Sequence, residues 1–164
     1  MKRVLAVLAV VVVVASIGTG VLIWRLAQQP RQEHPEISAY SQGHLTRVGP
    51  YLYCDVDDFN NCENPQTVGQ LAVDGRHPVQ LSVPPAIARA PWLLGRAYED
   101  SDVVDEFRPD STLAVTIPTV DPHRGKLTRI VVQLPTIVID AEGNERPSWH
   151  AEWSIETVWP QPAP

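Results

Sequence analysis

Proline is the feature of this 164-residue chain that most restricts its fold. All 16 prolines lie beyond residue 29, where about one residue in eight is proline. Proline lacks a backbone N–H and clashes with the preceding helical turn, so this spacing excludes long helices. We therefore expect an all-β body made of strands and loops.

Alternating apolar and polar side chains locate the strands. The alternation is clear at 79–83, 113–117 and 149–156, and it is typical of strands with one buried and one wet face. Clusters of turn-forming residues separate such segments. We expect about seven or eight strands, near 37–42, 44–54, 67–73, 78–83, 92–98, 112–118, 127–139 and 149–158.

Short strands at this spacing predict one antiparallel β-sandwich of about 7–8 strands. A short helical turn is expected at 85–89, stopped by Pro91. Trp92 then opens a central strand, which is an immunoglobulin-like feature. However, Cys54 and Cys62 are too close in sequence to form the usual bridge between immunoglobulin sheets.

An uncharged segment from Val4 to Trp24 follows two basic residues at the N-terminus. Its 21 residues are enough to cross a bilayer as a transmembrane helix, and Trp24 beside Arg25 is typical of a membrane interface. A cleaved signal peptide is the alternative, because small residues follow the first apolar stretch. Both interpretations export the rest of the chain.

The expected organisation follows from these segments. Residues 1–25 form a signal anchor, 26–36 a stalk, 37–158 the β-sandwich domain and 159–164 a proline-rich tail. We expect a single-pass protein of the cell membrane with an extracytoplasmic C-terminal domain, or a secreted protein if the anchor is cleaved. An exported chain with two cysteines predicts a disulfide between Cys54 and Cys62.

Charge restricts the partners. Every acidic residue follows residue 32, so residues 26–164 hold 10 basic and 19 acidic side chains, a formal charge of −9. Such a chain repels a phosphate backbone, and no basic stripe offsets the repulsion. We therefore expect the membrane as a partner of the N-terminus and no nucleic acid.

The sequence contains no phosphate-binding glycine loop, zinc-protease motif, serine-nucleophile elbow or Cys-x-x-Cys motif. The histidines stand singly, at His34, His44, His77, His123 and His150. Single histidines usually lie on the surface, although distant residues can converge in a fold. We expect no enzyme, and we predict no catalytic residue, cofactor or metal ligand.

Two acidic segments leave alternatives open. Residues 55–61 are rich in the side-chain oxygens that Ca²⁺ prefers, but their spacing departs from the EF-hand pattern. Residues 99–110 hold six acidic side chains around Arg108. Solvated loops and faces are the usual explanation for both segments. A cation site in either, or docking of a basic partner on the second, is the alternative.

The tryptophans are assigned by alternation. Trp92, Trp149 and Trp153 are expected in the core, with the lining of a glycan or lipid pocket as the alternative. Trp159 lies beyond the last expected strand and precedes a proline, so it is expected to be the most exposed of them.

Four segments carry a family resemblance: YLYC at Tyr51–Cys54, NNCE at Asn60–Glu63, VQLSVPPAIARAPWLL at Val79–Leu94, and the closing WHAEWSIET strand. With the N-terminal anchor, they resemble an actinobacterial, mycobacterial-type family of exported, membrane-anchored domains of unknown function. The resemblance spans most of 37–158. It implies a location in the cell envelope and an immunoglobulin-like fold, and it supplies no catalytic residue.

We expect a non-enzymatic binding module, anchored in the membrane, that recognises an envelope protein or transporter through its strand edges and loops. The alternative is an extracytoplasmic accessory protein that binds a lipid, glycan or cation for a membrane transporter. An empty pocket lined by Trp149 or Trp153 would favour the alternative.

Overall fold

The computed structural model describes residues 15, 16, 18–21, 34–56, 58, 61–139 and 142–160. The chain divides into two units, Met1–Glu33 and His34–Pro164. In the first unit, residues 15, 16 and 18–21 are helical, and the rest of the expected anchor and the stalk up to residue 33 lie outside the described residues. Among the described residues, no helix has the length and apolar character needed to cross a membrane.

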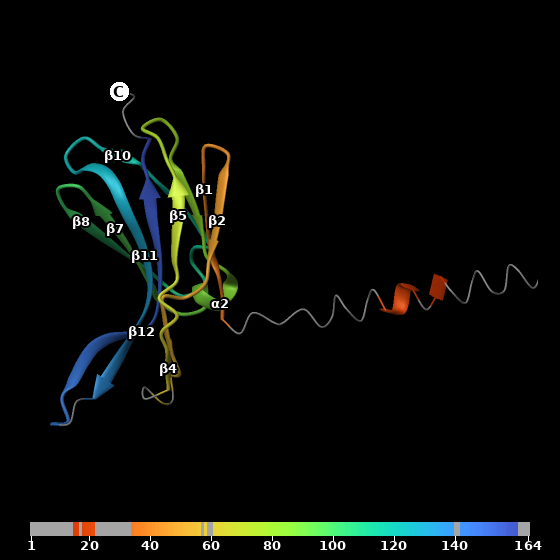
Figure 1. Cartoon of the computed structure of the whole chain (residues 1–164). Coiled ribbons are helices and arrows are strands. Elements are labelled where there is room, and N and C mark those ends of the chain that lie inside the picture. The colour runs from red at the N-terminus through yellow and green to blue at the C-terminus, as the bar shows by residue number, and fades with distance from the viewer. Residues whose placement is uncertain are drawn as a thin grey trace, which may run out of the picture. The chain divides into compact units, whose positions relative to one another are not determined.

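Two sheets form the second unit (Figure 1). The smaller sheet has the order β2-β1-β6-β9, and all of its neighbouring strands are antiparallel. Its strands are β1 (Ile37–Ser41), β2 (His44–Val48), β6 (Val79–Ser82) and β9 (Ala114–Ile117). A short helix, α2 (Pro85–Ala88), follows β6.

The larger sheet has eight strands and the order β4-β3-β12-β11-β7-β8 along its main path. These strands are β3 (Leu52–Cys54), β4 (Cys62–Glu63), β7 (Trp92–Tyr98), β8 (Asp102–Phe107), β11 (Gly125–Ile139) and β12 (Glu145–Val158). Two further strands join it: β10 (Val120–Asp121) pairs with β11, and β5 (Val68–Ala72) pairs with β12 in parallel.

One core is shared by the two sheets, which is consistent with the predicted β-sandwich. The smaller sheet contributes fully buried side chains such as Ile37 and Leu81, and the larger sheet contributes Trp92, Ile130 and Trp153. The alternation that predicted strands at 79–83 is matched by burial of every second residue in β6. The prediction of an all-β fold with antiparallel sheets is therefore confirmed.

Two strand predictions need correction. The segment expected as one strand at 44–54 is divided between the sheets, because Gly49 and Pro50 interrupt it after β2 and before β3. No strand was expected at 102–107, where the structure has the edge strand β8, paired with β7 and with Asp102 and Glu106 exposed. In β8, half-buried and exposed residues alternate.

Trp149 was predicted in the core, and the structure contradicts this. Leu134 pairs with Ala151, whereas the next residue, Pro135, pairs with Trp149, so His150 is an extra residue in β12. An extra residue reverses the phase of a strand. Trp149 is consequently turned away from the core and is 46% exposed.

Trp159 was predicted to be exposed, and it is instead partly buried against the core. Its indole Nε1 donates a hydrogen bond of 2.8 Å to the carbonyl oxygen of Leu127. The Nζ atom of Lys126 lies 5.3 Å from the centre of the indole ring, within cation–π range. These contacts hold Trp159 against the core although it lies beyond the last strand and precedes a proline.

The two sheets approach closely where β5 passes β2. A Cβ atom added to Gly69 would lie 2.2 Å from Cγ2 of Val48. We therefore expect Gly69→Ala to reduce the free energy of unfolding by about 1–3 kcal/mol, a typical cost of overpacking. Thermal unfolding should show a lower Tm, whereas the matched change Gly75→Ala, whose nearest atom would lie at 3.7 Å, should have little effect. Equal effects at the two positions would contradict the close approach.

Candidate functional site

Two hairpins mark one end of the larger sheet. β3 and β4 form the first, and the disulfide between Cys54 and Cys62 joins directly paired residues of these strands. The distal parts of β11 and β12 form the second, which projects beyond the body of the sheet (Figure 1). The predicted disulfide is confirmed, and it closes the loop between β3 and β4.

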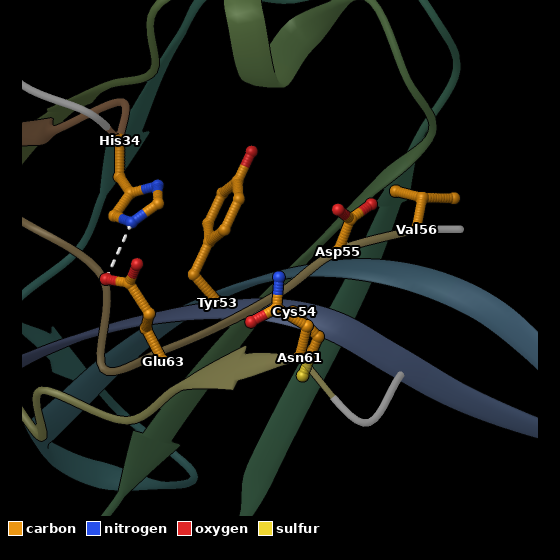
Figure 2. Close-up of a pocket in the computed structure, with 7 residues that line it drawn as sticks. All are labelled: His34, Tyr53, Cys54, Asp55, Val56, Asn61 and Glu63. Carbon is orange, nitrogen blue, oxygen red and sulfur yellow. Dashed lines mark hydrogen bonds and ion pairs between the residues drawn. The ribbon is translucent and has the colours of Figure 1, made fainter. Parts of the chain in front are cut away.

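A pocket of about 290 Å³ lies beside the disulfide hairpin (Figure 2). Its lining comes from the segment before β1, from β3 and β4, and from the loop that the disulfide closes. The lining residues are His34, Tyr53, Cys54, Asp55, Val56, Asn61 and Glu63. Long-range pairing thus assembles a site that no local motif encodes.

The His34 imidazole is held on two sides. Its ring stacks on Tyr53 with 4.2 Å between the ring centres, and its Nε2 lies 3.0 Å from Oε2 of Glu63. A carboxylate can only accept, so Nε2 is the donor, which fixes a proton on this nitrogen. Nδ1 is buried and has no hydrogen-bond partner among the described residues.

The pocket is supported by the core. The ring of Tyr53 meets the buried indole of Trp153 edge-on, with ring centres 6.3 Å apart. The Trp153 Nε1 donates a 2.8 Å hydrogen bond to the carbonyl oxygen of Pro35. Residues 34 and 35, which the sequence assigned to the stalk, are therefore in contact with the β-domain.

The first acidic segment contributes to this pocket. Asp55 and Asn61 line it, and the Asp55 backbone N–H donates to the Asn61 carbonyl oxygen at 3.0 Å. Asp57, Phe59 and Asn60 lie outside the described residues. Within the part of the chain that is described, no group of three or more His, Cys, Asp or Glu side chains could hold a metal ion.

The second acidic segment does not converge on a site. Asp105 pairs with Arg96 across the β7–β8 ladder. Glu99 instead accepts a 3.0 Å hydrogen bond from the backbone N–H of Lys126. These contacts stabilise strands and turns at the edge of the sheet.

The other histidines are dispersed. His77 lies in a turn in which Asp74 accepts hydrogen bonds from the backbone N–H groups of Arg76 and His77, at 2.9 and 2.8 Å. The Arg76 N–H, the His77 side chain and the His77 N–H lower the pKa of Asp74 to about 2. Desolvation lowers the pKa of His150, the extra residue of β12. Neither histidine lines the pocket.

The distal hairpin has an exposed apolar face. Register pairs Ile137 with Pro147 and Pro135 with Trp149, and paired residues share a face in an antiparallel ladder. Ile139 lies on the same face, because it is two residues beyond Ile137. Ile137, Ile139 and Trp149 are 64%, 73% and 46% exposed. We call Pro135, Ile137, Ile139, Pro147 and Trp149 the apolar face.

Sequence reasoning identified neither the apolar face nor the pairing of His34 with Glu63. These two residues are 29 positions apart and share no motif. The nearest sequence signal was Cys62, because a disulfide next to Glu63 fixes that part of β4.

Comparison with known proteins gives a family. A family model described as "Protein of unknown function (DUF2771)" matches residues 30–158. Uncharacterized proteins of Mycobacterium bovis and Mycobacterium tuberculosis are each 54% identical to the chain over 162 residues, which is 97% of this chain and 100% of the relative. No solved structure matches the chain.

The disulfide should stabilise the domain by restricting the unfolded chain. For cysteines eight positions apart, loop-closure entropy gives about 2.5 kcal/mol. We expect a thiol reductant to lower the Tm of the wild type. The double variant Cys54→Ser/Cys62→Ser should start from the lower Tm and should not respond to reductant. A response in the double variant would assign the effect of reductant to something other than this bond.

Asp74 predicts a pH dependence. Its carboxyl has an ordinary pKa of 3.8 and a folded-state pKa of about 2, so its ionised form stabilises the fold. This contribution is complete above the unfolded-state pKa and is lost as the pH falls through about 2. The Tm of the wild type should therefore exceed that of Asp74→Asn near neutral pH, and the difference should shrink as the pH falls from about 4 to about 2. A difference that is constant with pH would contradict this role.

Proposed function

Because the chain belongs to the DUF2771 family of unknown function, we propose its function from its own geometry. It is a non-enzymatic binding module of the cell envelope. Residues 1–25 anchor it in the membrane as a single-pass segment, and the β-domain is extracytoplasmic, where it binds another envelope protein. The apolar face of the distal hairpin is the observation that carries this proposal.

The apolar face is suited to a protein interface. Exposed aliphatic side chains are common singly, but a contiguous group containing a tryptophan on a projecting element is typical of an interaction surface. Tryptophan is also the residue type most often central to binding energy. The phase reversal at His150 sets Trp149 on this face instead of in the core.

Charge favours a protein over a lipid surface. In the sequence, Asp140 and Glu142 lie between the two strands, and in the structure Glu145 pairs with Ile139 at the edge of the apolar face. Anionic headgroups would be repelled by these carboxylates, whereas a partner with Lys or Arg around an apolar patch would complement them. The partner surface is therefore apolar at its centre and basic at its rim.

Location rests on the sequence and on the disulfide. The uncharged run from Val4 to Trp24 is long enough for a membrane helix, and disulfides persist in oxidising compartments. The immunoglobulin-like arrangement is also part of the proposal. Two sheets around a shared core, with Trp92 buried at the start of a central strand, support it.

Photocrosslinking tests the binding surface. A photoreactive residue at Ile137 of the full chain, in cells, should form an adduct with a protein, and the same residue at Val104 should not. The two positions are matched, because both are 64% exposed and lie on strands of the larger sheet. Trp149→Ser should lower the affinity for the partner by roughly thirtyfold, the equivalent of ~2 kcal/mol. The yield of the adduct at Ile137 should fall as a result.

The outcomes are separable. Equal adducts at Ile137 and Val104, or adducts with lipid alone at Ile137, would overturn the protein-binding surface. Alkaline extraction of membranes tests the anchor independently, because an anchored chain stays in the membrane fraction and a cleaved chain does not. A mature N-terminus near residue 20 would overturn the anchor and leave the binding surface in place.

A further inference from the structure

The pocket beside the disulfide has a hydrogen-bonding character of its own. Glu63 and Asp55 contribute carboxylates, which can only accept hydrogen bonds. The Glu63 side chain is 60% exposed, and its bond to His34 uses one oxygen, Oε2. A carboxylate has about four lone-pair sites, so it can accept from a ligand as well.

His34 does not offset this acceptor character. Its Nε2 donates to Glu63, so that donor is already used within the protein. Its Nδ1 is buried, so it offers a ligand no further donor. The charged side chains of the pocket therefore present acceptors, and a matching ligand must bring several donors.

The shape of the pocket adds an aromatic wall. Tyr53 rises between His34 and Asp55 in Figure 2, and His34 occupies one face of its ring. The edge contact with Trp153 holds the ring in place from the core side. A cation that enters on the Asp55 side of this ring therefore meets a fixed aromatic ring and a carboxylate, the combination that stabilises ammonium and guanidinium groups.

We propose that this pocket binds the cationic end of an Arg or Lys side chain presented by the protein partner. A guanidinium carries five N–H donors and no acceptor, and an ammonium carries three donors and no acceptor, so both match the acceptor-rich lining. Val56 lines the same pocket and is exposed, which gives the aliphatic stem of such a side chain an apolar contact.

This inference rests on the proposed function, because a protein partner supplies the side chain. It adds the chemistry of one contact, and it does not require the same segment of the partner to cover the apolar face. The excess of 19 acidic over 10 basic side chains in residues 26–164 favours the approach of a basic partner.

The test is a titration of the full chain in neutral detergent micelles, with isotope-labelled histidine and tyrosine rings observed by NMR. The probe is N-acetyl-arginine amide, and its control is N-acetyl-citrulline amide, which has nearly the same shape and no charge. The arginine probe should shift the ring signals of His34 and Tyr53 saturably, with a roughly millimolar Kd. The citrulline probe should not.

Variants locate the interaction. Asp55→Asn leaves both His34 and Glu63 in place. It should raise the Kd of the arginine probe by about tenfold, the equivalent of one charge-assisted hydrogen bond. Asp102→Asn removes an exposed carboxylate on β8, far from the pocket, and should leave the Kd unchanged. Asp102→Asn should keep the wild-type Tm, and the Asp55→Asn titration is made well below the Tm measured for that variant.

Three results would overturn the proposal. These are an equal response to citrulline, a response that never saturates, and an equal loss of affinity in Asp55→Asn and Asp102→Asn. Methylguanidinium tests the source of the cation, because binding as tight as that of the arginine probe would indicate a free small cation. If the arginine probe does not bind but the crosslink at Ile137 still forms, only the role of the pocket is overturned. Loss of that crosslink overturns the proposed function.

Discussion

The pairing of β11 with β12 is the interaction on which the other parts of the domain depend. These strands have 15 and 14 residues, and every other strand of the larger sheet is attached to one of them directly or through a neighbour. The register shift at Pro135 divides their ladder in two. Before the shift, alternate residues such as Ile130 face the core. After it, Trp149 joins Ile137 on an exposed face, so a single extra residue, His150, separates the part of the ladder that contributes to the core from the part that carries the apolar face.

The pocket depends on the same ladder through Trp153. This indole is fully buried, contacts the edge of Tyr53 and donates to the Pro35 carbonyl oxygen. The chain is therefore fastened to the core at the point where it enters the domain, and His34 is placed against Tyr53 as a result. The disulfide restrains the opposite wall. A pocket with both walls fixed loses little conformational freedom when a ligand binds, which favours affinity from a small contact area.

Much of the fold could be predicted, because alternation and proline spacing report directly on strands. The predicted strand at 92–98 and the burial of Trp92 and Trp153 agree with the structure. Predictions were wrong where tertiary contacts override local pattern: the phase reversal at His150 is invisible in a sequence that alternates regularly, and hydrogen bonding to Leu127 buries Trp159. The pairing of His34 with Glu63 could not be predicted from the sequence, because only the order of the strands in the sheet brings these two residues together.

Glu142 and Glu145, the described acidic residues of the distal hairpin, have two physical effects. A projecting hairpin with exposed Ile137 and Ile139 presents apolar side chains and free strand edges, which is the arrangement that promotes edge-to-edge aggregation. Charged residues at such positions oppose the pairing of identical chains, because like charges meet across the contact. Glu145, opposite Ile139, has this effect on a second copy and the reverse effect on a basic surface. In the proposed function, the carboxylates that oppose the pairing of identical chains therefore also favour a basic partner, as do the carboxylates of the pocket beside the disulfide.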